Sequence, residues 1–210
     1  RALHRSLEPK LPSAPRESSF HWDIPPPPGG ILVGRAYADG SRLYAEHKYC
    51  GLVARQGWAF TILNDQGRVI AAASGVTPWW AQGIYAAELY ALLNATQHAA
   101  PSTPFYVDCQ SVQVGSKNGD TWAHSPCRKF GRLWMPIMNA IDADPQRVKW
   151  LPAHCNESAI GVRCLSDGTL LSGDDLKAND SVDRAAKARA RTSPPSGSDL
   201  TMIIETSSLV

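Results

Sequence analysis

The chain has 210 residues, a mass of 22.8 kDa and a hydrophobic fraction of 43%. This length suits one well-buried domain with extensions and is short for two domains. The net charge of +2 excludes a general attraction to polyanions, so any binding of nucleic acid has to come from local patches. No apolar run approaches the roughly 20 residues of a membrane span, and we expect no membrane partner.

Both ends of the chain are rich in proline. Residues 1–30 contain "IPPPPGG", and proline removes backbone donors and favours extended polyproline conformation. We therefore predict a flexible linker over 1–30, one domain over 31–190 and a C-terminal tail over 191–210.

The predicted domain begins with short apolar runs typical of strands. Strands are predicted within residues 31–39, 51–63 and 68–75, and the Asn, Asp and Gly of residues 64–67 suit a tight hairpin. Asp39 closes the first of these strands, at an Asp-Gly-Ser sequence typical of a turn. Three consecutive strands imply an antiparallel meander.

Helices and strands alternate in the second half. Ala and Leu at helical spacing predict a helix over 84–99, followed by a strand within 104–109. Further helices are predicted within 111–119, 126–142 and 174–190, the second of them strained by Pro136, and a last strand within 147–154. The class is α/β, with a mixed five-stranded sheet flanked by helices.

Five cysteines are present, and none forms a C-x-x-C pair. An odd number leaves at least one unpaired, which favours reduced thiols and an intracellular protein, in the nucleus or the cytoplasm. His154 has Cys155 and Cys164 nearby, but structural zinc sites usually contain closely spaced ligand pairs, so we do not expect zinc.

Four acids stand out in the predicted elements. Asp39 and Asp108 close predicted strands, and Glu88 and Asp183 lie in predicted helices. Taken singly, each has an ordinary explanation as a turn, helix or strand-end residue. Taken together, acids that end neighbouring strands can converge at one edge of the sheet, where their charges would repel unless cations held them. Mg²⁺ prefers such oxygen ligands, so the set predicts a metal site.

These residues resemble the ribonuclease H domain of type 1, as found alone and at the end of retroelement reverse transcriptases. The resemblance rests on "ADGS", "AAELYAL", "VDCQSV", "WLPAH" and "NDSVD", in that order. It implies a ribonuclease H-like fold and two Mg²⁺ ions, or Mn²⁺, held by the four acids. It also implies that RNA–DNA hybrid is the partner and that the domain belongs to a larger reverse-transcriptase polyprotein.

The same resemblance assigns further residues to the site. His154 would assist proton transfer or product release, and it completes the catalytic set with the four acids. Gly40, Ser41 and Gln110 match positions near the substrate strand, and Asn179 precedes Asp183 by four residues, on one helical face. For Ser41 and Gln110, an ordinary role as polar turn residues stays open.

Three features depart from the family pattern. The stretch before the glutamate helix contains Trp79 and Trp80 where relatives have an Asn- or Thr-rich segment, and these rings either stack on substrate or pack under the loop. The basic handle is reduced to Arg128, Lys129 and Arg132, which bind phosphates or form a solvated helix face.

The third departure is an insertion over 155–178, long enough for a lid or hairpin over the cleft. It brings further acids at 174, 175 and 180 near the last helix, and the "NDSVD" match favours Asp183 among them as the last ligand. The sequence thus predicts hydrolysis of the RNA strand of RNA–DNA hybrids by two-metal-ion catalysis. Two alternatives stay open: an inactive nucleic-acid-binding or scaffold module of the same fold, and a related nuclease or integrase acting on DNA.

Overall fold

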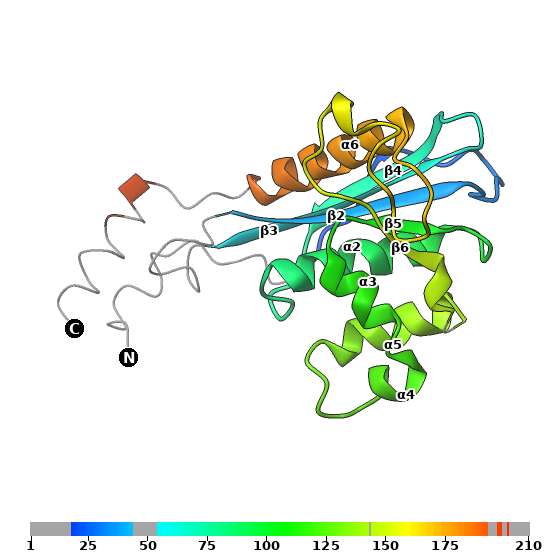
Figure 1. The fold of residues 1–210 in the computed structure, drawn as a ribbon. Coiled ribbons are helices and arrows are strands. Elements are labelled where there is room, and N and C mark those ends of the chain that lie inside the picture. Colours follow the sequence, from blue (N-terminus) through cyan, green and yellow to red (C-terminus); the bar gives the residue numbers. More distant parts are fainter. Residues whose placement is uncertain (1–17, 44–53, 143, 193–196, 199–200, 202–210) are drawn as a thin grey trace, which may run out of the picture.

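A computed structural model describes residues 18–43, 54–142, 144–192, 197, 198 and 201. A twisted sheet separates two helical layers (Figure 1), with strand order β1-β4-β3-β2-β5-β6. The strands are β1 (His21–Ile24), β2 (Arg35–Leu43), β3 (Arg55–Leu63), β4 (Val69–Val76), β5 (Phe105–Val107) and β6 (Val148–Trp150). The α/β class and the mixed sheet with flanking helices are therefore confirmed.

The meander of β2, β3 and β4 forms as predicted. The Asn64 side chain accepts hydrogen bonds from the backbone N–H groups of Gln66 and Arg68, and Gly67 adopts a φ of 73° that closes the turn. Strands β5 and β6 then join the other side of β2 in parallel. Residues 51–53 of the predicted second strand lie outside the described residues.

The prediction that Asp39 ends a strand is wrong. Strand β2 continues to Leu43, and Asp39 pairs with Ala59 in the middle of the β2–β3 ladder. The Gly40-Ser41 pair is extended, not a turn, because it pairs with Trp58 and Gly57 across the ladder.

The sheet has six strands where five were predicted, because part of the expected linker over 1–30 forms β1 against β4. Phe20 and Trp22 pack on the ring of His98, with centroid distances of 5.0 and 5.1 Å. The Asp23 carboxylate receives a hydrogen bond from Ser74 and pairs with Arg189 at 3.0 Å. These contacts stabilise an extended segment that the neighbouring prolines concealed. Residues 1–17 and most of the predicted tail lie outside the described residues.

One face of the sheet is covered by the helices of the middle of the chain. These are α2 (Ile84–His98), α3 (Gln110–Ser116), α4 (Gly119–Ala123) and α5 (Gly131–Ala140). The larger apolar core lies between α2, α5 and the sheet, and Pro136 lies inside α5 without ending it. None of the helices in the described part of the chain is long and apolar enough to cross a membrane.

Helix α6 (Gly173–Ala190) covers the other face and packs most closely on β2 and β3. It begins with a capping box between Ser172 and Asp175, so the last six residues of the predicted 155–178 insertion are helical. The rest of the insertion buries Leu165 and Leu171 in a second core beneath α6. Its Ser166 exchanges two hydrogen bonds with the backbone of Trp150, at 2.9 and 2.8 Å, and thereby covers the edge strand β6.

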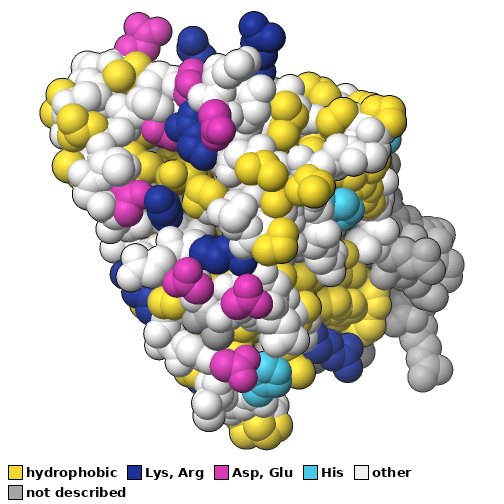
Figure 2. Space-filling view, turned by 90° about the vertical axis from the view of Figure 1, so that its right-hand side faces the viewer, with side chains coloured by type: hydrophobic (Ala, Val, Ile, Leu, Met, Phe, Trp, Pro, Cys, Tyr) yellow, Lys and Arg dark blue, Asp and Glu magenta, His cyan; other side chains and the backbone are white. Residues whose placement is uncertain are grey.

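Acidic and basic side chains are interspersed, without a large patch of one sign, on the face that lies at the right in Figure 1 (Figure 2). This distribution agrees with the small net charge of the chain. It gives this face no strong attraction to a polyanion.

Candidate metal centre

Three of the predicted acids meet at one place. Each of Asp39, Glu88 and Asp108 offers a carboxylate oxygen, and these three oxygens lie within 4.8 Å of one another. They come from β2, from α2 and from the residue that follows β5. In the described residues this acid trio is the one group of three or more His, Cys, Asp or Glu side chains with the spacing of a metal site.

Gly40 lets Glu88 reach the other two acids. A Cβ at residue 40 would lie 2.2 Å from the backbone nitrogen of Glu88, so only glycine allows α2 to approach β2 this closely. The Gly40 N–H donates to Glu88 Oε2 at 3.0 Å and fixes the carboxylate. Glycine is therefore required at residue 40 because a side chain would not fit against α2, and not because the backbone turns there.

Asp108 is fixed from two sides. The indole Nε1 of Trp150 donates to its backbone carbonyl at 2.9 Å, and Nδ2 of Asn179 donates to its Oδ2 at 3.4 Å. Asn179 is itself buried, and its Oδ1 has no hydrogen-bond partner in the described structure. A buried acceptor without a donor beside three carboxylates suits a site completed by a cation or its water.

Charge and burial oppose ionisation of the acid trio. Burial, together with the negative charges of Asp108 and Asp183, raises the pKa of Asp39 to about 8. Burial and the charges of Asp39 and Asp108 raise the pKa of Glu88 as well. Burial also raises the pKa of Asp108, against the opposing effects of the Asn179 hydrogen bond and the His154 charge. A bound cation would remove this penalty.

Asp183 lies beside the acid trio but not within it. Its charge acts on both Asp39 and Asp108, while its own Oδ2 accepts from Lys187 Nζ at 2.7 Å. Its assignment as the fourth metal ligand remains a prediction. The sequence prediction did not include Lys187. Its spacing of four residues from Asp183, along one face of the helix, is the signal that could have identified the pair.

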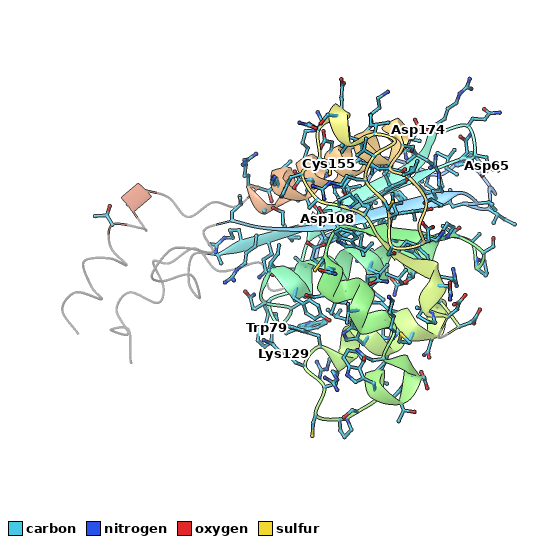
Figure 3. All side chains as sticks on the ribbon, in the orientation of Figure 1. Asp65, Trp79, Asp108, Lys129, Cys155 and Asp174 are labelled. Carbon is cyan, nitrogen blue, oxygen red and sulfur yellow. The ribbon has the colours of Figure 1, made fainter. Side chains whose placement is uncertain are left out.

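The competing acids of the insertion point elsewhere. Asp174 pairs with Arg35 Nη2 at 3.5 Å and lies away from Asp108, on the side where Asp65 is labelled (Figure 3). Asp175 is buried in hydrogen bonds to Tyr37 and Ser172, and Asp180 is exposed. Of the four candidates, Asp183 is the one whose charge reaches the acid trio.

The remaining predicted site residues surround the acid trio unevenly. His154 is exposed, adopts a left-handed φ of 50°, and lies close enough to act electrostatically on Asp108. Ser41 is buried two residues after Asp39 on β2, and Gln110 is exposed at the start of α3. The substrate roles of Gly40, Ser41, Gln110 and Asn179 and the catalytic role of His154 remain predictions.

The two tryptophans and the basic residues lie to one side of the acids. Trp79 is 60% exposed, whereas Trp80 packs against the larger core. One open hollow, formed by the segment between α4 and α5 and the start of α5, is lined by Trp80, Arg128, Lys129 and Arg132. Figure 3 labels Trp79 and Lys129 on the same side of the molecule.

Arg128 is held in this hollow by an aromatic contact that the sequence did not reveal. Its guanidinium lies 4.0 Å from the ring centroid of Trp122. A guanidinium stacked on an indole loses little further freedom when it binds an anion. The signal in the sequence is only a Trp six residues before an Arg, which no local rule connects.

No protein-family profile matches this chain, and no curated protein matches its sequence. Several solved structures match its fold. The RNase H domain of PFV is 15% identical, with a TM-score of 0.52, and the match covers 78% of this chain and 98% of that domain. The protease–reverse transcriptase of prototype foamy virus is 12% identical, with a TM-score of 0.52, over 87% of this chain and 22% of that protein.

RNase H1 of Halobacterium salinarum matches over 74% of this chain and 95% of its own, with 14% identity and a TM-score of 0.46. At these identities the likeness concerns the fold and not the chemistry. The fold of this chain is that of the ribonuclease H domains.

Proposed function

We propose that the chain is a divalent-metal-dependent endonuclease that hydrolyses the RNA strand of RNA–DNA hybrids. The observation that carries the proposal is the convergence of Asp39, Glu88 and Asp108, from three separate elements of a ribonuclease H fold, within 4.8 Å. Buried carboxylates at this spacing are costly unless a cation holds them, so their convergence supports a metal-dependent activity.

The residues present fit a hard cation. Carboxylate oxygens are the donors that Mg²⁺ and Mn²⁺ accept, and the trio offers no thiolate or imidazole that would favour a softer metal. Burial and the neighbouring carboxylates raise the pKa of Asp39, and a cation bound among these acids would offset that effect. We propose two Mg²⁺ ions as the physiological occupants, with Mn²⁺ as a substitute.

The acids have the central part in the proposed reaction. Asp39, Glu88, Asp108 and, as the fourth ligand, Asp183 hold the ions. A bound pair of cations supplies an activated water and stabilises the leaving oxygen of a phosphodiester. His154, exposed beside Asp108, takes up or delivers the proton that the reaction moves.

The substrate is proposed from the fold and from the polar residues near the acids. An enzyme that cleaves only RNA has to recognise the 2′-hydroxyl, through polar groups in the wide minor groove. We propose that Ser41, Gln110, Asn179 and the backbone at Gly40 contact this strand. Arg128, stacked on Trp122, is available for phosphates of the hybrid.

The larger context is also a proposal. The likeness to a domain within the protease–reverse transcriptase of prototype foamy virus supports a place in a retroelement polyprotein that acts in the nucleus or the cytoplasm.

The test is cleavage of a labelled RNA–DNA hybrid in Mg²⁺, with Asp108→Asn as the inactive variant. Asp65→Asn, an exposed turn acid labelled away from the site in Figure 3, is the matched control. We expect cleavage by the wild type and Asp65→Asn only, on hybrid and not on duplex DNA or single-stranded RNA. Binding without cleavage would identify an inactive module, and cleavage of duplex DNA would identify a related DNA nuclease.

A further inference from the structure

A second group of side chains lies near the acids, on β2, β5 and α6. Tyr37 precedes Asp39 by two residues in β2, and Tyr106 precedes Asp108 by two residues at β5. Because side chains alternate along a strand, each tyrosine lies on the same face as the acid that follows it. Tyr37 and Tyr106 are register partners, and their rings stack with centroids 5.0 Å apart and planes 17° apart.

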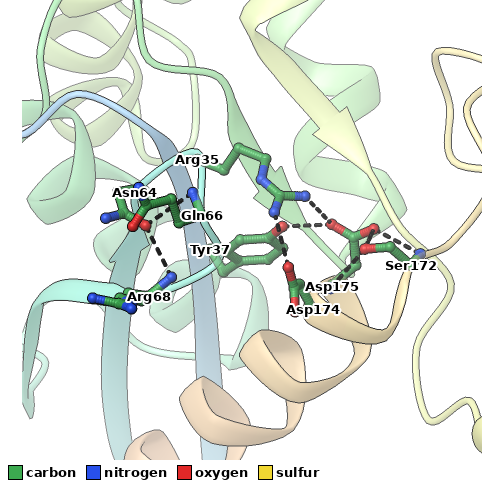
Figure 4. Close-up of polar contacts among 8 residues, drawn as sticks. All are labelled: Arg35, Tyr37, Asn64, Gln66, Arg68, Ser172, Asp174 and Asp175. Carbon is green, nitrogen blue, oxygen red and sulfur yellow. Dashed lines mark hydrogen bonds and ion pairs between the residues drawn. The ribbon is translucent and has the colours of Figure 1, made fainter.

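Asp175 joins α6 to this group (Figure 4). Its Oδ1 accepts from the Tyr37 hydroxyl at 2.5 Å and from Arg35 Nη1 at 3.3 Å. Its Oδ2 accepts from the backbone N–H and the hydroxyl of Ser172, at 2.8 and 2.6 Å. One carboxylate therefore caps its own helix and binds that helix to β2. Because Asp175 is 3% exposed and Tyr37 is fully buried, neither group can replace a lost partner with water.

The spacing along α6 connects this anchor to the acid site. Asn179 and Asp183 follow Asp175 by four and eight residues, so all three lie along one stripe of the helix. Asn179 donates to Asp108, and the charge of Asp183 acts on Asp39 and Asp108. A shift or rotation of the start of α6 would displace both groups from the acid trio.

We propose that Tyr37 and Asp175 are positioning residues for the metal centre. They fix α6 against β2 and β5 and thereby hold Asn179 and Asp183 at the acid trio. This inference rests on the proposed function only in taking the trio as a metal site. It makes no use of hybrid cleavage.

The first experiment measures Mn²⁺ binding by calorimetry in wild type, Tyr37→Phe and Asp175→Asn. Tyr37→Phe keeps the stacked ring and removes only the hydroxyl that Asp175 accepts from. Losing a group that orients metal ligands typically weakens affinity about 10–100-fold, and we expect about tenfold here. Thr96→Val is the control, because it removes a buried hydroxyl of α2 that bonds only within its own helix.

The second experiment repeats Tyr37→Phe in a background that carries both Asn179→Ala and Asp183→Asn. If Tyr37 acts through α6, its effect on Mn²⁺ affinity shrinks to less than twofold once neither residue of α6 can act on the acid trio. Amide exchange at Asn179 should be faster in Tyr37→Phe than in Thr96→Val. This measurement reports how readily α6 opens locally, and it needs no metal.

The outcomes separate this proposal from the proposed function. Wild type that fails to bind Mn²⁺ refutes the metal site and this inference with it. Wild type that binds, with Tyr37→Phe binding as tightly as Thr96→Val, refutes the positioning role alone. A tenfold loss that persists undiminished in the background with both Asn179→Ala and Asp183→Asn also refutes it, because the hydroxyl would then act directly and not through α6.

Discussion

The substitution Asp39→Asn should stabilise the metal-free protein. The Asp39 carboxyl titrates near pH 8 in the folded chain, against an ordinary value of 3.8. Between these values the folded chain holds one more proton at this site than the unfolded chain does. The free energy of unfolding therefore falls as pH rises, by about 1.4 kcal/mol per pH unit.

The size of the effect at neutral pH follows from this interval. The stability associated with the protonated carboxyl is fully present below about pH 3.8 and is lost progressively up to about pH 8. By pH 7 the loss is about 4 kcal/mol, which is large beside the 5–15 kcal/mol of a typical domain. Asparagine has the same shape and no charge, so we expect it to recover about 2 to 4 kcal/mol at pH 7.

Urea denaturation in EDTA at pH 5, 6, 7 and 8 measures this, with Asp65→Asn as the control. The wild type should lose stability across the series, and Asp39→Asn should lose less. Excess Mg²⁺ should stabilise the wild type at pH 7 and should have little effect on Asp39→Asn. Equal pH slopes for wild type and Asp39→Asn in EDTA would refute the reasoning, because Asp39 would then be ionised in the fold without penalty.

Two further substitutions test the approach of α2 to the site and the binding of the ion by Asp183. Gly40→Ala places a Cβ 2.2 Å from a backbone nitrogen of α2; urea denaturation should show a loss of about 3 kcal/mol, absent from Gly173→Ala, where the nearest atom is 3.8 Å away. Lys187→Met frees Asp183 of a cation 2.7 Å away; Mn²⁺ titration should show about fivefold tighter binding, and no change for Lys177→Met, an exposed lysine of the same helix. Unchanged Mn²⁺ affinity in Lys187→Met would mean that Asp183 does not bind the ion.

The sequence predicted the elements best where one signal controls them. The Ala- and Leu-rich helix before residue 100 differs from its prediction by a single residue at the end, because helical periodicity continues over four turns. The hairpin at Asn64 and Gly67 followed from residue types that suit one kind of turn. These features depend on local chemistry alone.

Features that depend on distant partners were predicted poorly. Strand β1 was assigned to a linker because its stability comes from β4, from His98 and from Arg189, which no local pattern announces. Asp39 was placed at a strand end because "DG" usually marks a turn, yet the ladder with β3 extends past it. Tertiary pairing overrode the local preference in both cases.

The candidate site shows the same division in another form. The four acids could be selected from the sequence because their residue type carries the chemistry and their order matched a family. The sequence did not mark the contacts of Tyr37 and Lys187, and it offered Asp175 only as a competing metal ligand. These contacts become visible only when the helix and the strands are seen together.

Two glycines decide whether the acids can meet at all. Gly40 lets α2 approach one face of the sheet, and a Cβ at Gly57 would lie 2.1 Å from the Ala186 carbonyl oxygen of α6 on the other face. Neither residue offers a ligand, but each side-chain-free position lets a helix that carries acids of the site approach the sheet. A chain with all four acids and a larger side chain at 40 or 57 would keep the motif and lose the geometry. The acidic motif indicates which groups are available to a cation, and the glycines determine whether those groups converge.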